Sequence, residues 1–258
     1  MKILIIGDIY SNSGRLMVEK YLPKVREKYN INFIVANGEN IAHGNGITER
    51  YYHFLLDQHV NVVTMGNHTW GNAEIFKFIN NAKVLVRPLN YPQGSPGVGY
   101  VTVKYNQTTI TVFQVLGRTF INQALDCPFQ ATEKLLKEVK SDIYICDFHG
   151  EATSEKIAFG YHFDGRVNII VGTHTHVQTN DARVLNGGTM YMTDLGMTGA
   201  LDGVIGVEPD GIIKKFLTGM PVRHNPMEKG QKQFCGLVVD IDERTRKVTK
   251  YDIINMVE

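Results

Sequence analysis

Five short apolar runs along the chain each lead into residues that can bind a metal ion. Runs of this length, rich in Val and Ile, are typical of buried strands, and helical segments between them predict a layered α/β fold. Such folds bind ligands at the ends of their strands. The runs are residues 2–7 before Asp8, 33–36 before Asn37-Gly38-Glu39-Asn40, 62–65 before Gly66-Asn67-His68, 142–146 before His149, and 167–171 before Gly172-Thr173-His174-Thr175-His176.

Two segments are predicted to form helices. Between residues 48 and 59, apolar side chains recur three and four positions apart, and Thr48 stands where an N-cap belongs. Residues 14–29 predict a second helix, which Pro23 is expected to kink or split because proline removes one backbone hydrogen bond.

The second half of the chain reads as more β-rich. We expect one domain over residues 1–258, because a chain of this length can bury a single large core. The many glycines between Gly187 and Gly219 predict a long loop, and we interpret residues 187–230 as a loop or lid near the active site. The predicted strand pairs are residues 98–103 with 109–115, and residues 234–242 with 247–254.

Charge and composition exclude several classes of protein. The formal net charge is +1, with 27 Lys and Arg against 26 Asp and Glu, so we expect no strong generic binding to nucleic acid. The first residues hold too few apolar positions for a signal sequence or a membrane span, and we expect a cytoplasmic protein that binds no membrane. Three widely spaced cysteines are interpreted as packing residues.

The candidate donors combine carboxylate, amide and imidazole groups. This mixture suits iron, manganese or zinc, and the set is too large for one tetrahedral ion. Two ions about 3.5 to 4 Å apart, bridged by one carboxylate, would use all of them. His174 and His176 alternate in a segment expected to be extended, so their side chains should point to the same side. The predicted metal ligands are Asp8, Glu39, Asn40, Asn67, His149, His174 and His176.

The order of these motifs resembles that of the calcineurin-like metallophosphoesterases. That superfamily usually begins with Asp-x-His, whereas here Tyr10 takes the place of the His, and Asn37-Gly38-Glu39-Asn40 replaces the usual Gly-Asp-x-x-Asp or Gly-Asp-x-x-Glu. Both departures are similar to the bacterial YmdB-like branch, and the resemblance spans nearly the whole chain. The other shared segments are Asp147-Phe148-His149, Glu151-Ala152-Thr153-Ser154-Glu155-Lys156, Gly196-Met197-Thr198-Gly199 and Pro221-Val222-Arg223.

The resemblance implies a fold of two mixed β-sheets flanked by helices and a role for each donor. It implies two divalent or mixed-valence ions, most readily iron or manganese, that supply a bridging hydroxide for in-line attack on phosphorus. Glu39 would bridge the ions and His68 would be the general acid, although Thr69 offers no carboxylate to orient it. The coordination of one ion would be completed by Asp8, His176 and Asn40, with Asn40 in place of the missing His. The coordination of the other ion would be completed by Asn67, His149 and His174.

Three functions remain open at this point. The first, which the resemblance favours, is a phosphodiesterase acting on cyclic nucleotides, of the 2′,3′ kind. The others are a phosphomonoesterase acting on nucleotides or phosphoproteins, and a metal-binding regulatory protein without turnover. A P-loop enzyme is disfavoured because the chain has no Gly-x-x-x-x-Gly-Lys-Ser/Thr motif. A homo-oligomer is left open.

A few further residues are candidates for supporting roles. His43 lies three residues beyond a predicted ligand and is a candidate for substrate contact. Asp147 and Glu151 flank His149 and are candidate acceptors for the ligand imidazoles. Arg118 and Arg223 are candidates for binding phosphate.

Overall fold

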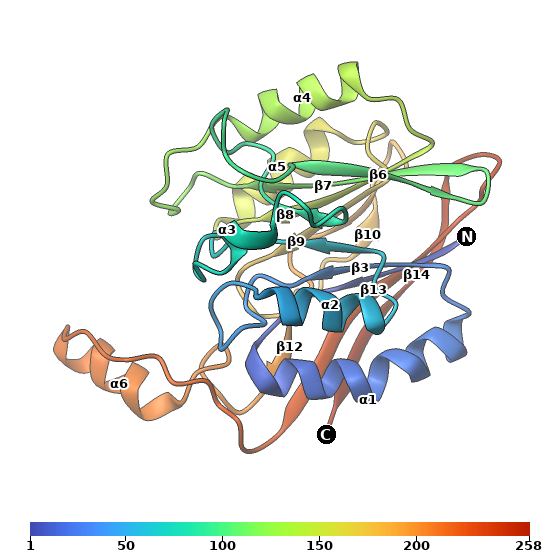
Figure 1. Ribbon diagram of the computed structural model, residues 1–258. Helices are drawn as coiled ribbons and strands as arrows, with labels where there is room; N and C mark the ends of the chain where they lie inside the picture. Colours follow the sequence, from blue (N-terminus) through green and yellow to red (C-terminus); the bar gives the residue numbers. More distant parts are fainter.

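The computed structural model describes residues 1–258 and contains two β-sheets packed face to face, with helices outside them (Figure 1). One sheet has eight strands and the other six. The eight-stranded sheet consists of β1 (Lys2–Ile6), β2 (Asp8–Ile9), β3 (Phe33–Asn37), β4 (Val62–Thr64), β5 (Leu85–Val86), β12 (Met197–Ala200), β13 (Lys232–Ile241) and β14 (Val248–Val257). The six-stranded sheet consists of β6 (Tyr100–Tyr105), β7 (Thr108–Leu116), β8 (Ile143–His149), β9 (Ile169–Thr173), β10 (Arg183–Val184) and β11 (Met190–Met192).

Both sheets are mixed, with a parallel centre. In the first, the order is β2-β12-β13-β1-β3-β4-β5, with β14 paired to β13, and β1, β3, β4 and β5 run parallel. In the second, the order is β10-β11-β9-β8-β7-β6, and β7, β8, β9 and β11 run parallel. All five predicted strands with donors at their ends therefore lie in the parallel parts of the two sheets.

Six helices complete the fold. Helices α1 and α2 cover the outer face of the eight-stranded sheet, and α4 and α5 cover that of the six-stranded sheet, whereas α6 projects from the body (Figure 1). None of the helices is both long and apolar enough to cross a membrane. The helices are α1 (Ser11–Tyr29), α2 (Glu49–Asp57), α3 (Ile75–Phe78), α4 (Pro128–Glu138), α5 (Thr153–His162) and α6 (Pro209–Thr218).

Two predicted helices are confirmed, with one correction. Thr48 is the N-cap of α2, and its side chain accepts a hydrogen bond from the backbone N–H of Tyr51 at 3.4 Å. Pro23 does not split α1, which runs unbroken from Ser11 to Tyr29. The buried apolar face of α1 packs against the sheet, and this tertiary packing outweighs the loss of one backbone hydrogen bond.

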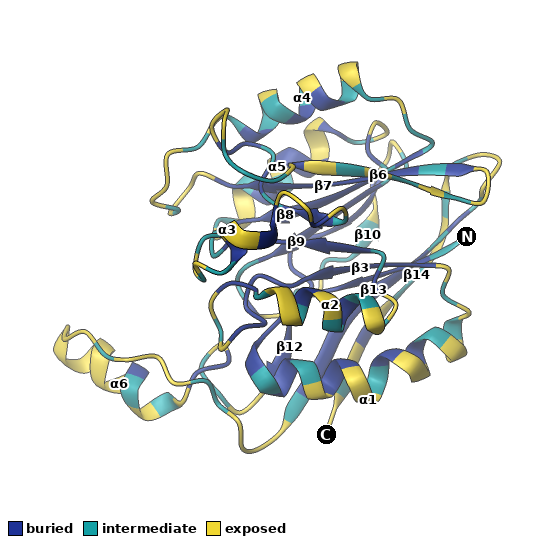
Figure 2. Cartoon of the chain, in the orientation of Figure 1, coloured by how far each residue is buried: buried dark blue, intermediate teal, exposed yellow.

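The alternation of side chains along each strand builds three apolar layers. In β1, Ile3 and Ile5 face the space between the sheets, whereas Leu4 and Ile6 face α1 and α2. A third cluster fills the space between the six-stranded sheet and helices α4 and α5. Figure 2 shows the strands as the most deeply buried elements and α6 as largely exposed.

The two predicted strand pairs are confirmed as antiparallel hairpins, β6 with β7 and β13 with β14. The segment from Gly187 to Gly219 differs from the expected long loop. It contributes β11 to one sheet and β12 to the other, and then forms α6. Several of the glycines there have close neighbours: a Cβ on Gly196, whose φ is +78°, would lie 2.8 Å from atoms of Gln178. Gly196 therefore allows close packing as well as a turn.

Candidate metal centre

The seven predicted metal ligands come together at the carboxyl ends of the parallel strands. We call them the donor cluster: Asp8, Glu39, Asn40, Asn67, His149, His174 and His176. Five strand ends, from both sheets, contribute to it, and oxygen or nitrogen atoms of Asp8, Glu39 and His149 lie within 4.8 Å of one another. All three of these side chains are buried. The seven residues chosen from the sequence therefore lie together in the structure, and their role as metal ligands stays a prediction.

Three donors converge on one side of the cluster. The Oδ1 atom of Asn67 lies 2.8 Å from Nε2 of His149 and 3.0 Å from Nδ1 of His174. The two imidazole nitrogens lie 3.1 Å apart. One oxygen and two nitrogens at such short distances form a ready set of ligands for a single cation.

Asn40 and His176 form the other side of the cluster, and we group Asp8 with them, although its Oδ1 atom also lies 3.9 Å from Nδ1 of His149. The Nδ2 atom of Asn40 is 3.1 Å from Nε2 of His176. Asp8 accepts a hydrogen bond through Oδ2 from the backbone N–H of His174, at 3.1 Å, but its buried Oδ1 has no hydrogen-bond partner. A buried carboxylate oxygen without a partner is costly, and a cation is the group that satisfies it best.

Glu39 lies between the two sides. Its Oε1 atom is 3.2 Å from Nε2 of His149 and 3.2 Å from Nδ2 of Asn40. Its Oε2 atom accepts a hydrogen bond from the backbone N–H of His68 at 3.0 Å. Glu39 is thus in contact with side chains of both halves of the donor cluster.

A chain of hydrogen bonds fixes the ring of His149. Its Nδ1 atom lies 2.8 Å from Oγ1 of Thr173, which in turn donates to Oδ1 of Asp147 at 2.6 Å. Because the Thr173 hydroxyl gives its proton to Asp147, it accepts the proton of His149 Nδ1. The Nε2 atom of His149 is therefore the one turned toward the other donors.

The other two imidazoles are held in the same way by different acceptors. His174 places Nε2 at 3.1 Å from a carboxylate oxygen of Glu151, which leaves Nδ1 facing the cluster. His176 donates from Nδ1 to the backbone oxygen of Ile205 at 2.9 Å, which leaves Nε2 facing the cluster. In each case one ring nitrogen is anchored and the other is available as a ligand.

The backbone that presents these two histidines is not extended, contrary to the expectation from sequence. Strand β9 ends at Thr173, and the φ angles of His174 and His176 are 103° and 65°. Both angles are unfavourable for a residue with a Cβ, and such strain is concentrated at functional sites. The two side chains reach the same cluster because of these turns and not because of strand alternation.

Burial and charge set the protonation of the cluster. Burial raises the pKa of Asp8 to about 6. Burial also lowers the pKa of His174 to about 3, and the neighbouring His149 adds to this shift, so the His174 ring is neutral at pH 7. Although burial opposes charge on His149, the adjacent Glu39 raises the pKa of its ring to about 9. The negative charge of Glu39 thus favours a positive charge at this point, whether a proton or a metal ion.

His68 lies at the edge of the cluster, with the Nδ1 atom of its ring directed toward the other donors. Its Nδ1 atom is 2.8 Å from Oδ1 of Asn40 and 3.1 Å from Oε1 of Glu39, and 41% of its side chain is exposed. These contacts explain how the ring is oriented although Thr69 has no carboxylate. Thr69 instead donates its hydroxyl proton to the backbone oxygen of Gly66 at 2.6 Å.

Comparison with known proteins identifies the family. A family model described as YmdB-like protein matches residues 4–254. The 2′,3′-cyclic-nucleotide 2′-phosphodiesterase of Bacillus subtilis (strain 168) is 49% identical over 256 residues, which cover 98% of this chain and 96% of the relative. The chain belongs to the YmdB-like family.

Solved structures agree with this assignment. A phosphatase from Mycoplasma pneumoniae superposes with a TM-score of 0.95 at 35% identity, over 100% of this chain and 93% of that one. A 5′-nucleotidase from Staphylococcus aureus shares the fold alone, with a TM-score of 0.64 at 14% identity, over 98% of this chain and 53% of that one. The predicted calcineurin-like sandwich of two mixed sheets flanked by helices is confirmed.

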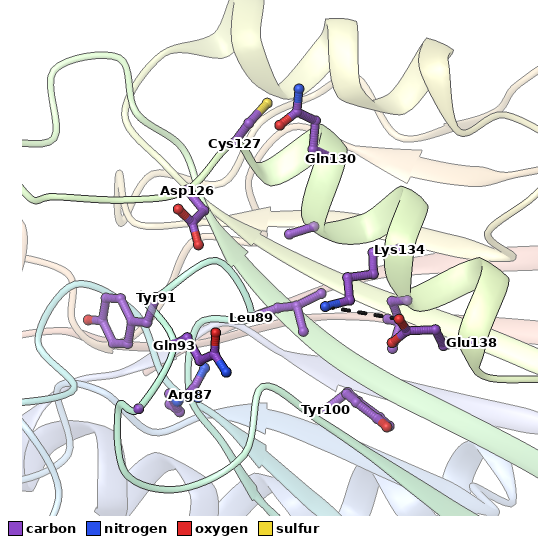
Figure 3. Close-up of a pocket in the computed structure, with 13 residues that line it drawn as sticks. Arg87, Leu89, Tyr91, Gln93, Tyr100, Asp126, Cys127, Gln130, Lys134 and Glu138 are labelled. Atoms are coloured by element: carbon purple, nitrogen blue, oxygen red, sulfur yellow. Dashed lines mark ion pairs between the residues drawn. The ribbon is translucent and has the colours of Figure 1, made fainter.

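A cavity of about 280 Å³ opens directly onto the donor cluster of this YmdB-like protein. It is lined by Glu39, His68, Glu151, His174, Thr175, His176 and Ile205. A larger cavity of about 580 Å³ lies elsewhere, between α4 and the segment around Tyr91 (Figure 3). Two of its charged side chains, Lys134 and Glu138, pair with each other at 4.0 Å, and none of the donors lines it. The smaller cavity is therefore the candidate substrate site.

Only some of the supporting residues suggested by the sequence contact the donor cluster. Glu151 does contact a ligand imidazole, whereas Asp147 acts on His149 only through Thr173, which the sequence analysis had not singled out. The position of Thr173 inside the Gly-Thr-His-Thr-His motif was the sequence feature that could have indicated its role. The side chains of His43, Arg118 and Arg223 are exposed and make no hydrogen bond with the donor cluster.

The Thr173 contact gives a first prediction. Thr173→Val keeps the size of the side chain but removes the acceptor for His149 Nδ1, so the affinity for Mn²⁺ is expected to fall by about 10- to 100-fold. Titration of the chelator-treated protein measures this. The control is Thr111→Val, since Thr111 is equally buried and its hydroxyl bonds to Thr102 at 2.8 Å, away from the cluster. Equal Mn²⁺ affinities in the two variants would contradict the role given to Thr173.

Proposed function

We propose that this protein is a metal-dependent phosphodiesterase that hydrolyses 2′,3′-cyclic nucleotides. The observation that carries the proposal is the position of Glu39, in contact with both halves of the donor cluster and at the wall of an open cavity. The reaction is that of the Bacillus subtilis relative, as its name gives it, and 49% identity over nearly the whole of both chains supports its transfer.

In this proposal each half of the cluster holds one ion. Asn67, His149 and His174 would hold the first, Asp8, Asn40 and His176 would hold the second, and Glu39 would be shared between them. Iron or manganese fits the mixture of oxygen and nitrogen donors best, and zinc is also compatible. A pair of such ions, when bound, activates water as a nucleophile and offsets negative charge on the phosphoryl group.

His68 is the group that handles the proton of the leaving oxygen. With Nδ1 anchored to Asn40 and Glu39, the half-exposed ring can present Nε2 to a phosphodiester in the cavity. Cleavage of the 2′ ester bond needs a proton on the departing 2′ oxygen, and an imidazolium in hydrogen-bond reach supplies it. The other ester bond stays intact, so the product is a 3′-monophosphate.

The main test compares substrates and metals. The purified protein is assayed with 2′,3′-cyclic AMP, 3′,5′-cyclic AMP and p-nitrophenyl phosphate, before and after chelation and with Mn²⁺ added back. We expect hydrolysis of the 2′,3′-cyclic nucleotide to a 3′-monophosphate, loss of activity on chelation and recovery with Mn²⁺. Preferential hydrolysis of the monoester would favour a phosphomonoesterase, and full activity without metal would refute the proposed mechanism.

A second prediction concerns His68. His68→Ala should retain metal but slow hydrolysis of the cyclic nucleotide by about 10²- to 10⁴-fold, the usual contribution of a general acid. The loss should be smaller for bis-p-nitrophenyl phosphate, whose leaving group needs no protonation. Steady-state rates and metal content are measured on the same samples, with exposed His53→Ala as the control. A parallel fall of metal content and rate would make His68 a ligand instead.

A third prediction concerns Glu39. Glu39→Gln preserves the length of the side chain but removes the negative charge placed between the two halves of the cluster. At least one ion should therefore be lost, and turnover with it, because repulsion between the two cations is no longer offset. Metal stoichiometry, rate and circular dichroism are measured against Glu133→Gln, which removes a surface ion pair. Two tightly bound ions in Glu39→Gln would show that another residue is the bridge.

A further inference from the structure

A buried lysine lies behind the donor cluster, outside the set of residues so far given a role. Lys156, on α5, is 1% exposed, although lysine is among the residues least often buried. Its Nζ atom donates to the backbone oxygen of Thr173 at 2.8 Å and to Oδ2 of Asp194 at 2.9 Å. The charge is therefore paired inside the protein.

Asp194 binds the backbone on the other side of His174, opposite the Thr173 carbonyl that Lys156 contacts. Its Oδ2 atom also accepts a hydrogen bond from the backbone N–H of Thr175 at 3.1 Å, and its Oδ1 atom accepts one from the backbone N–H of Gly196 at 2.9 Å. Asp194 is completely buried. The Lys156–Asp194 pair thus holds the carbonyl of Thr173 and the N–H of Thr175.

His174 is the residue between these two anchored peptide groups. Its φ angle of 103° is one that residues with a Cβ rarely adopt, so the surrounding structure must enforce it. The packing is also tight: a Cβ on Gly172 would lie 3.0 Å from Cδ of Lys156. The backbone around His174 therefore has little freedom to relax while the ion pair is present.

Stability alone does not account for such a pair. Removing two charges from water is costly, and replacing a buried ion pair with apolar side chains of similar size is often neutral for stability. Hydrogen bonds to a strained peptide give the pair another use. They hold the imidazole where its Nδ1 atom meets Asn67 and His149.

We propose that the Lys156–Asp194 ion pair is a positioning device that holds His174 in its strained, metal-binding conformation. The inference rests on the proposed two-ion site and names the residues that set the affinity of one half of it. Removal of the pair should weaken the ion held by Asn67, His149 and His174. The ion held on the side of Asp8 and His176 should be affected much less.

The test is a Mn²⁺ titration of the full-length chelator-treated protein, with thermal unfolding on the same samples. The double variant Lys156→Met with Asp194→Leu removes both charges together, so no charge is left buried alone. We expect a folded protein in which one of two Mn²⁺ sites is weakened by about 10- to 100-fold, the usual effect of losing a group that orients a ligand. The control is Arg166→Met with Glu133→Leu, which removes an exposed ion pair and should change neither site.

A second variant covers the case in which the double variant does not fold. Asp194→Asn keeps the shape but replaces one acceptor oxygen with an NH₂ group, so one of the anchored N–H groups loses its partner. The same weakening, confined to one Mn²⁺ site, is expected. Two unchanged Mn²⁺ affinities in a folded variant, or equal weakening of both sites, would overturn the inference.

The outcome is separable from that of the proposed function. If the unaltered protein binds two Mn²⁺ ions but does not hydrolyse 2′,3′-cyclic AMP, the substrate assignment fails and the positioning role still stands or falls on the titrations. If the unaltered protein binds no Mn²⁺, both proposals fail. If it binds two and the variants do the same, only the positioning role fails.

Discussion

The buried carboxylate of Asp147 joins the two sheets at the edge where the donors gather. It accepts hydrogen bonds from Asn37 and Thr64, at the ends of two strands of the eight-stranded sheet, and from Thr173 in its own sheet. Apolar packing between the sheets is not directional, whereas these three hydrogen bonds are, and so they fix how the two edges align. Because the donors come from both sheets, the geometry of the whole cluster depends on this alignment.

Several carboxyl groups are also buried together at the centre of the protein. Burial raises the pKa of both Asp8 and Asp147, and an oxygen of Asp8 has no hydrogen-bond partner. An apolar core would be less costly, so these buried carboxyl groups lower the stability of the protein unless a cation compensates them. Metal binding and folding stability are therefore linked: an ion that binds only the folded protein stabilises it in proportion to the logarithm of its concentration.

The sequence was sufficient to predict the strands, the polar residues that gather at their ends and the family. Strand periodicity and the groups Gly66-Asn67-His68 and Gly172-Thr173-His174-Thr175-His176 are local features that can be read directly. Their convergence also follows, because the carboxyl ends of parallel strands meet at one edge of a sheet. For the same reason all seven predicted ligands lie together, although their binding of metal ions stays a prediction.

What only the tertiary structure decided were the contacts between residues far apart in the chain. The glycine-rich segment after Gly187 read as a loop, because no local pattern reveals that short strands will pair within two different sheets. The turns at His174 and His176 were read as extended, because no local sequence pattern reveals their positive φ angles. The peptide groups on either side of His174 gain their bonds to Lys156 and Asp194 only in the folded chain. The sequence by itself determined which chemical groups the site contains. Their orientation depends on hydrogen bonds that exist only once the chain has folded, and no local propensity encodes them.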